Sequence, residues 1–166
     1  MDYQKAFDRV KHDKLVEIME RVGVPDLESR LILNLYWRQH ATVGWNGEVG
    51  IKVKVERGIR QGCIISSLLF NLYSEFMMRE AMEGVEGIKF NEINITDIRY
   101  ADDAVLVADK LKKMQKMVDS LNDTCRAYGM EINVKKVKVM IMGIKVKNGV
   151  QRCNVVQCAF GTSDAF

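Results

Sequence analysis

Two adjacent carboxylates, Asp102 and Asp103, stand in the polar segment 99–103 between short apolar runs at residues 95–98 and 105–107. Apolar runs on both sides of a polar turn predict a β-hairpin with the aspartates at its tip. Adjacent aspartates repel one another unless a cation lies between them, and Mg²⁺ commonly takes one or two carboxylates together with substrate phosphates. Because Asp is also a common turn residue, a plain solvated turn is the competing interpretation.

The composition is that of one folded domain or of a piece of a larger one. The chain has 166 residues, of which 48% are hydrophobic, enough to bury a core. Its net charge of +3 permits a polyanionic partner without requiring one. Between residues 110 and 147, ten Lys and Arg side chains accompany only three acidic ones. This segment suits contact with nucleic-acid phosphates, although a solvated helix face explains it equally well.

The cysteines indicate an intracellular protein with reduced thiols. The four cysteines, Cys63, Cys125, Cys153 and Cys158, have no spacing typical of a disulfide framework. A zinc site at Cys153 and Cys158 would lack nearby histidines. No signal peptide is visible, and no apolar run approaches the ~18 residues needed to span a bilayer. We therefore expect a cytoplasmic or nuclear location and no membrane partner.

Two helices and a clear hairpin are predicted ahead of the paired aspartates. Asp13 and Asp26 are the expected N-caps of the helices. The second helix is expected to bury Leu27, Leu31, Ile32, Leu35 and Tyr36. Alternating residues on both sides of Asn46-Gly47 predict a hairpin with a type I′ turn, one apolar face and one solvated face.

The later part of the chain predicts further helices and strands. A loop at residues 57–63 leads into a helix from near Ser66, and another helix is expected to end at Gly129. The helix that ends at Gly129 is expected to bury Leu111, Met114, Val118, Leu121, Cys125 and Tyr128. Two short strands are predicted at residues 130–134 and 137–141, followed by a loosely held tail. Antiparallel strands with helices packed on one face make the fold class α+β.

Four segments in chain order resemble the palm of reverse transcriptases, specifically those of non-LTR, LINE-like retrotransposons. They are Asp-Tyr-Gln-Lys-Ala-Phe-Asp at 2–8, Arg-Gln-Gly-Cys with the following helix start at 60–71, Tyr-Ala-Asp-Asp at 100–103, and Gly-Met-Glu-Ile-Asn-Val-Lys-Lys at 129–136. The resemblance covers residues 1–142 and leaves 143–166 as an irregular C-terminal tail. It implies a polymerase palm, a ferredoxin-like antiparallel sheet with helices packed on one face.

The resemblance also implies an RNA-directed DNA polymerase that transfers nucleotides by a two-metal mechanism. Its partners would be an RNA template, a DNA primer and deoxynucleoside triphosphates, and its cofactor two Mg²⁺ ions, with Mn²⁺ as a substitute. Asp2, Asp102 and Asp103 would be the catalytic carboxylates that hold the metals. Lys136 would be a general acid for the departing pyrophosphate, unless it is simply a solvated lysine.

By the same resemblance, five residues would contact the substrate: Phe7, Arg60, Gln61, Gly62 and Tyr100. Phe7 matches the aromatic residue that stacks under the sugar and excludes a 2′-hydroxyl, and a packed core phenylalanine is its alternative. Gln61 and Gly62 match the loop that lines the nucleotide and template pocket. A glycine there lets the backbone approach a ligand closely.

The chain also departs from the family pattern. Asp2 directly follows Met1, so no strand precedes it and a frayed position is expected. No segment corresponds to the fingers, the thumb has no room after residue 142, Ser67 replaces a proline, and Val137 replaces a threonine. Two hypotheses stay open: a reverse transcriptase palm, or an inactive remnant that at most binds nucleic acid through residues 110–147. We expect the isolated chain to extend no primer.

Overall fold

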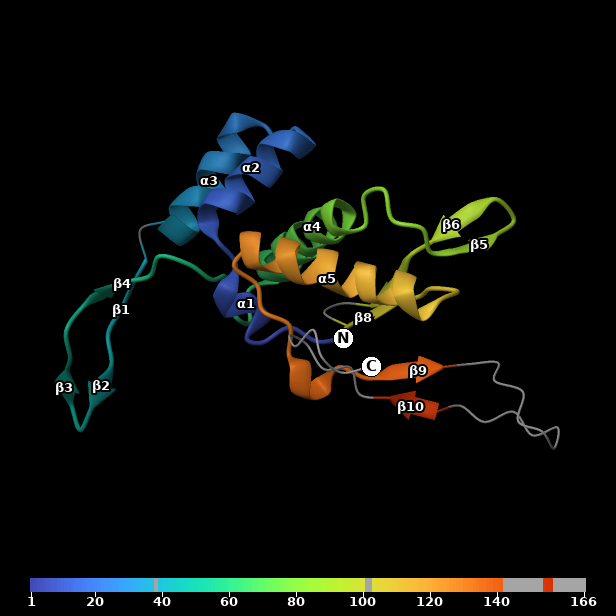
Figure 1. The fold of residues 1–166 in the computed structure, drawn as a ribbon. Coiled ribbons are helices and arrows are strands. Elements are labelled where there is room, and N and C mark those ends of the chain that lie inside the picture. The colour runs from blue at the N-terminus through green and yellow to red at the C-terminus, as the bar shows by residue number, and fades with distance from the viewer. Residues whose placement is uncertain (38, 101–102, 142–153, 157–166) are drawn as a thin grey trace.

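The computed structural model describes residues 1–37, 39–100, 103–141 and 154–156. Figure 1 shows a mixed α+β fold, which confirms the predicted class. Its helices are α1 (Ala6–Arg9), α2 (His12–Val22), α3 (Asp26–Trp37), α4 (Ile64–Ala81) and α5 (Leu111–Ala127), with a 3₁₀ turn, η1, at Val134–Lys136. Its strands pair antiparallel, β1 (His40–Ala41) with β4 (Val53–Lys54), β2 (Gly44–Trp45) with β3 (Glu48–Val49), β5 (Ile88–Phe90) with β6 (Ile93–Ile95), β7 (Asp97–Tyr100) with β8 (Asp103–Leu106), and β9 (Val139–Ile141) with β10 (Asn154–Val156).

Two further chain segments extend the β7–β8 pair through backbone hydrogen bonds. The N–H of Ala104 donates to the carbonyl of Met1 at 3.1 Å, and the amino group of Met1 donates back to Ala104. On the other side of residues 1–4, Tyr3 forms an antiparallel bridge with Ile132. Asp2 therefore lies in a segment held on both sides, and the expectation of a frayed position is wrong.

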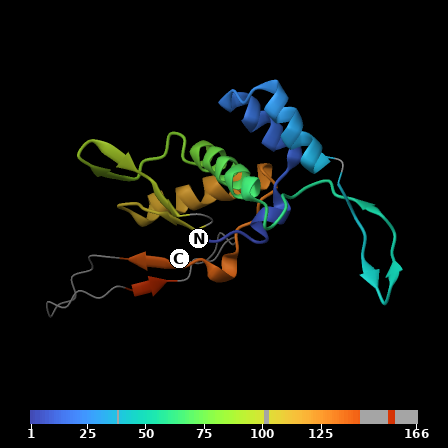
Figure 2. The same cartoon turned by 180° about the vertical axis from the view of Figure 1, so that it is seen from behind.

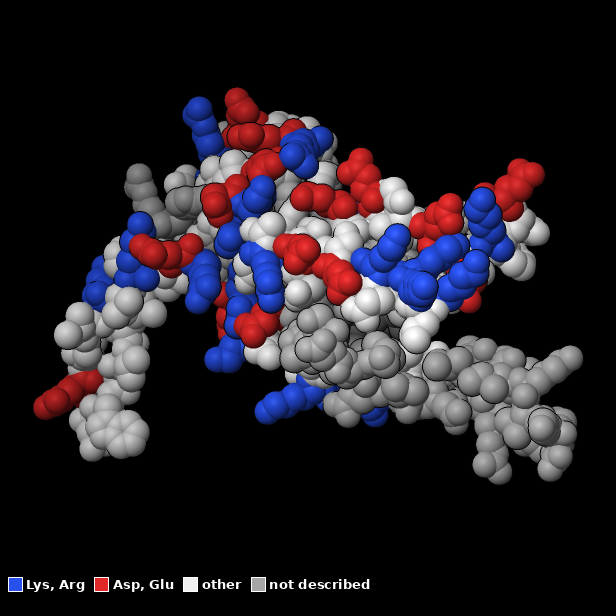
Figure 3. Space-filling view, in the orientation of Figure 1, with Lys and Arg blue, Asp and Glu red and all other residues white. Residues whose placement is uncertain are grey.

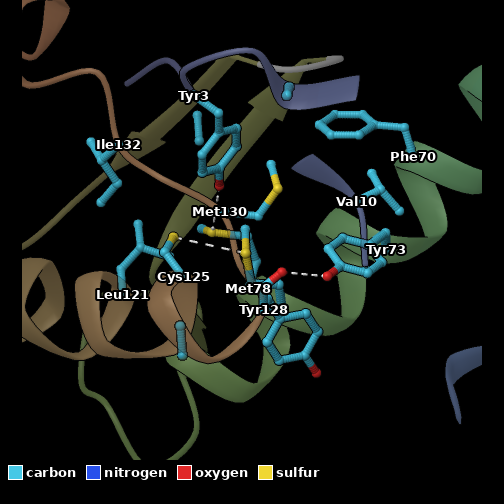
Figure 4. Close-up of a cluster of buried hydrophobic side chains, with 14 of the residues drawn as sticks. Tyr3, Val10, Phe70, Tyr73, Met78, Leu121, Cys125, Tyr128, Met130 and Ile132 are labelled. Carbon is cyan, nitrogen blue, oxygen red and sulfur yellow. Dashed lines mark hydrogen bonds between the residues drawn. The ribbon is translucent and has the colours of Figure 1, made fainter. Parts of the chain in front are cut away.

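Helices α4 and α5 lie side by side and cover one face of these strands (Figures 1 and 2). Along β8 the side chains alternate, so Ala104 and Leu106 are buried while Asp103 and Val105 are exposed. Figure 4 shows the resulting core, in which the hydroxyl of Tyr3 points to the sulfur of Met78 at 3.5 Å. The opposite face of the strands, which carries Asp103, is free of these two helices.

The starts of α2 and α3 differ slightly from the sequence-based prediction, and the buried face of α3 differs strongly. Asp13 and Asp26 lie inside the first turns of α2 and α3 instead of capping them. On α3, Tyr36 is buried and its hydroxyl lies 2.9 Å from that of Ser66 on α4. The predicted burial of three leucines is wrong, because packing through Tyr36 turns them outward: Leu27, Leu31 and Leu35.

The hairpin at residues 40–54 has the predicted turn but projects from the domain (Figures 1 and 2). Asn46 and Gly47 both have positive φ, 50° and 84°, which confirms the type I′ turn. The prediction of a single solvated face is wrong, because no described element covers the apolar side. Its apolar side chains are all exposed: Val43, Trp45, Val49, Ile51 and Val53.

The remaining elements follow the prediction in part. Helix α4 begins at Ile64, two residues before the predicted start. Gly129 ends α5 with φ 72°, as expected, although Leu111 at the other end of the helix is exposed. The strand predicted at 130–134 is reduced to the bridge at Ile132, because η1 turns the chain, and β10 lies within the segment predicted to be irregular. The boundary at residue 142 stays a prediction.

Candidate active site

Three of the predicted site residues lie in a row across neighbouring strands. Tyr100 is paired with Asp103 in the β7–β8 register. On the other side of β8, Met1 pairs with Ala104, and continuing this antiparallel register places Asp2 opposite Asp103. Opposed residues point to the same face of a sheet, so both carboxylates lie on the face away from α4 and α5. Asp102 lies outside the described residues.

Asp2 is in contact with the predicted general acid. The ammonium nitrogen of Lys136 lies 2.6 Å from Oδ2 of Asp2, whose side chain is 19% exposed. The N–H of Asn133 donates to the carbonyl of Asp2 at 2.8 Å, which brings η1 beside the N-terminal segment. The hydrogen bond from Lys136 lowers the pKa of Asp2, even though partial burial opposes this shift. A carboxylate and an ammonium group are thus held together at the open face.

A second group of predicted residues surrounds a hollow of about 410 Å³. Its lining residues come from α1, from the loop before α4 and from the start of α4: Phe7, Gln61, Gly62, Cys63, Ile64 and Ser67. Phe7 stacks on Phe70 with ring centroids 5.0 Å apart, so it packs on the core and also borders the hollow. Arg60 is exposed beside this hollow without lining it, and Tyr100 is 86% exposed on β7.

Backbone hydrogen bonds hold the loop that precedes the hollow against α1 and the residue that follows α1. The N–H of Ile59 donates to the carbonyl of Phe7 at 2.9 Å, and that of Gly58 donates to Val10 at 2.8 Å. Gly58 has φ 96°, and a Cβ at this position would lie 3.1 Å from the carbonyl oxygen of Asp8. Only glycine fits this conformation and this close approach without strain.

A cluster of charged residues on β7 and α4 was missed by the sequence-based reasoning. The guanidinium of Arg99 lies 2.6 Å from Glu75 and 2.7 Å from Asp97. These residues border a polar hollow of about 390 Å³ together with Asn71 and Ser74. The only signal in the sequence was that Asp97 and Arg99 share a strand face just before Tyr100, and Glu75 could not be connected with them.

The two described cysteines, Cys63 and Cys125, are free thiols. Backbone N–H groups at the start of α4 lower the pKa of Cys63, whereas burial raises that of Cys125 to about 12.

Within the described ranges, no three ligating side chains are grouped as a metal site. None of the described helices could cross a membrane.

Lysines of the segment 110–147 that the structure describes lie on α5 and beside Asp2. Figure 3 shows Lys and Arg side chains gathered over the first half of α5, on the outer side of the helix. Lys113 is partly neutralised there by Glu86 at 3.0 Å and Asp109 at 3.1 Å. Because α5 covers one face of the strands, this surface lies away from Asp2, whereas Lys136 contacts Asp2 at the open face.

Comparison with known proteins decides the family. The family model described as reverse transcriptase (RNA-dependent DNA polymerase) matches residues 1–158. The chain belongs to the reverse transcriptase family. This membership confirms the resemblance drawn from the four sequence segments, and it identifies the domain as one of the RNA-directed DNA polymerase family.

Curated relatives of this reverse transcriptase domain are retrotransposon proteins. The Pol polyprotein of the type-2 retrotransposable element R2DM from Drosophila melanogaster is 27% identical over 160 residues, 95% of this chain and 14% of that protein. The Pol polyprotein of the R2 element from Nasonia vitripennis is 25% identical over 142 residues, 86% of this chain and 14% of that protein. The transposon TX1 149 kDa protein from Xenopus laevis is 26% identical over 146 residues, 86% of this chain and 11% of that protein. The chain thus spans less than a sixth of these relatives.

Proposed function

We propose that this domain is the palm of an RNA-directed DNA polymerase from a non-LTR retrotransposon. The order of its elements supports the proposal. With α1–α3 and the hairpins β1–β4 and β5–β6 as insertions, residues 1–4, α4, β7, β8, α5 and residues 131–133 occur in the order β-α-β-β-α-β, in which the first and last segments pair through backbone hydrogen bonds and an isolated bridge. Their hydrogen bonds give the spatial order 131–133, 1–4, β8, β7. We infer from this order the ferredoxin-like arrangement expected of a palm.

The observation that carries the proposed chemistry is the placement of Asp2, in the segment paired with β8, beside Asp103 on the open face. With Asp102, they would form a set of hard oxygen donors suited to Mg²⁺ or Mn²⁺. The ammonium of Lys136, 2.6 Å from Asp2, occupies the position of a cation beside this carboxylate and supports the fit. Bound divalent ions would lower the pKa of the attacking 3′-hydroxyl and stabilise the leaving group.

The hollow beside Phe7 is the proposed place for the incoming deoxynucleoside triphosphate. Phe7 would lie against the sugar, and the Gln61-Gly62 backbone would approach the base or the template. Arg60, exposed at the rim, and Tyr100, exposed beside Asp103, would contact phosphate or primer from outside the hollow. Lys136 would donate a proton to the departing pyrophosphate after leaving Asp2.

Metal binding tests the proposed site on the purified chain. We expect Mn²⁺ titration, followed by electron paramagnetic resonance, to show saturable binding that Asp2→Asn and Asp102→Asn each weaken by at least about tenfold. Asp123→Asn, which changes an exposed carboxylate on α5, is the matched control and should leave binding unchanged. Absence of saturable binding, or equal affinities in all variants, would contradict the proposed metal site.

Primer extension distinguishes the polymerase from the non-catalytic alternative. Mg²⁺-dependent incorporation of dTTP on poly(rA)/oligo(dT), abolished by Asp102→Asn, would establish catalysis by this chain and exclude an inactive remnant. Salt-sensitive binding of the duplex without incorporation would support a nucleic-acid-binding remnant, since phosphate contacts weaken steeply as salt rises.

A further inference from the structure

The starting observation is a network of charges that connects β7 with α4. Arg99 on β7 contacts Glu75 of α4 through one nitrogen of its guanidinium group and Asp97 of its own strand through another, at 2.6 and 2.7 Å. The hydroxyl of Thr96 donates to Asp97 at 2.8 Å, and Arg79 contacts Glu75 from the next turn of α4 at 3.1 Å. The planar guanidinium group fixes the direction of both of its carboxylate partners.

The two elements joined by Arg99 carry the two halves of the proposed site. Arg99 lies on β7, whose last residue, Tyr100, is paired with Asp103 on β8. Helix α4 provides Ile64 and Ser67 to the lining of the nucleotide hollow. A shift of β7 against α4 would therefore change the separation between the carboxylates and the hollow.

Other contacts hold β7 in place only on one side. Among the described residues, its backbone pairs with β8 alone. On the side of α4, the space around Arg99 is a polar hollow of about 390 Å³ and not an apolar contact. Polar side chains line this hollow, and the Arg99–Glu75 pair connects the strand directly to the helix across it.

We propose that Arg99, through Glu75, is a positioning residue that sets the end of the β7–β8 pair, which carries Asp103, at the correct distance from the nucleotide hollow. The inference rests on the proposed function, since it assumes a metal beside Asp103 and a nucleotide in the hollow. Displacements near 1 Å cost a polymerase-type reaction heavily, because reacting groups must already be aligned. Arg99 and Glu75 themselves touch neither ligand.

The specific expectation concerns the coupling between metal and nucleotide. If Asp103 and the hollow are correctly spaced, Mn²⁺ bound at the proposed carboxylate site would favour binding of the triphosphate, so Mn²⁺ should raise the affinity for dTTP. Coupling of this kind is a free energy shared by two sites and is lost when their geometry changes. Loss of Arg99 should thus reduce the coupling while each ligand still binds alone.

The experiment measures the affinity of the chain for dTTP by calorimetry, with and without Mn²⁺. In Arg99→Gln and in Glu75→Gln we expect the enhancement by Mn²⁺ to fall by about tenfold, with the double variant no worse than either single one. Arg79→Gln is the matched control, because it removes the other partner of Glu75 but leaves the connection to β7 in place. Arg99→Lys, which retains one charged contact, should restore part of the enhancement.

The outcomes separate the two proposals. If the wild-type chain binds neither Mn²⁺ nor dTTP, the proposed function fails and this inference fails with it. If the wild type shows the enhancement and both Arg99→Gln and Glu75→Gln retain it, only the positioning role is overturned. A purely structural role would lower the midpoint of thermal unfolding and leave the enhancement intact, and this result would also overturn the inference.

Discussion

The ammonium group of Lys136 lies 2.6 Å from Oδ2 of Asp2, although 133 residues lie between the two along the chain. The contact brings the segment after α5 to the N-terminal segment at the open face of the strands. A single positive charge therefore lies where the proposed mechanism requires a divalent cation.

The first prediction follows from the competition between Lys136 and a divalent cation for Asp2. Lys136→Ala should raise the affinity for Mn²⁺ by about three- to tenfold, because the metal no longer has to displace an internal cation from Asp2. Electron paramagnetic resonance titration measures the effect, and Lys135→Ala, at the neighbouring position of η1, is the control. Unchanged or weaker binding in Lys136→Ala would show that the ammonium does not compete.

The second prediction concerns pH. The pKa of Asp2 is lowered below its ordinary value of 3.8, chiefly by the hydrogen bond from Lys136. A lowered native pKa means that ionised Asp2 stabilises the fold above pH 3.8 and that this contribution disappears as pH falls through the native pKa. The difference in unfolding free energy between wild type and Asp2→Asn, measured in urea, should therefore shrink from pH 7 towards about pH 2. A difference independent of pH would contradict the ion pair.

The third prediction tests the loop that leads to the hollow. Gly58→Ala should destabilise the domain by about 1–3 kcal/mol, since it combines positive φ with a close approach to Asp8. Gly62→Ala is the matched control, because it has φ 82° but nothing within 4 Å of the added Cβ, and it should cost only about 1 kcal/mol. Urea unfolding compares the two, and equal losses would mean that the contact with Asp8 contributes nothing.

The fourth prediction concerns Phe7 and the sugar of the nucleotide. Replacing Phe7 by Ala should reduce the preference for dTTP over UTP, because the ring that borders the hollow would no longer restrict the 2′ position. Phe7→Tyr keeps the ring and should keep the preference. Competition binding of the two nucleotides in the presence of Mn²⁺ measures the ratio. If Phe7→Ala retains the ratio, Phe7 is only a core residue stacked on Phe70.

The fifth prediction tests the observed face of α3. Leu31 is 59% exposed, so Leu31→Ala should change the free energy of unfolding by less than about 0.5 kcal/mol. Leu15 on α2 has no exposed surface, and Leu15→Ala should cost about 2–5 kcal/mol. Comparable losses at the two positions would support the sequence-based orientation of α3 over the observed one.

Local features were predictable from the sequence alone. The type I′ turn at Asn46-Gly47 and the end of α5 at Gly129 depend on positive φ, a property of the residues themselves. The family could be recognised too, because its motifs are short runs of neighbouring residues. The hairpin that carries Asp103 followed from two apolar runs around a polar turn.

Only the tertiary structure decided which distant residues meet. Backbone hydrogen bonds from Ala104 on one side and Asn133 on the other hold the segment of Asp2. Packing through Tyr36 turned the leucines of α3 outward, and the pairing of Arg99 with Glu75 joined a strand to a helix. Hydrophobic spacing along one helix identifies an apolar stripe but not the neighbour that will cover it, and an ion pair between remote segments leaves no local pattern.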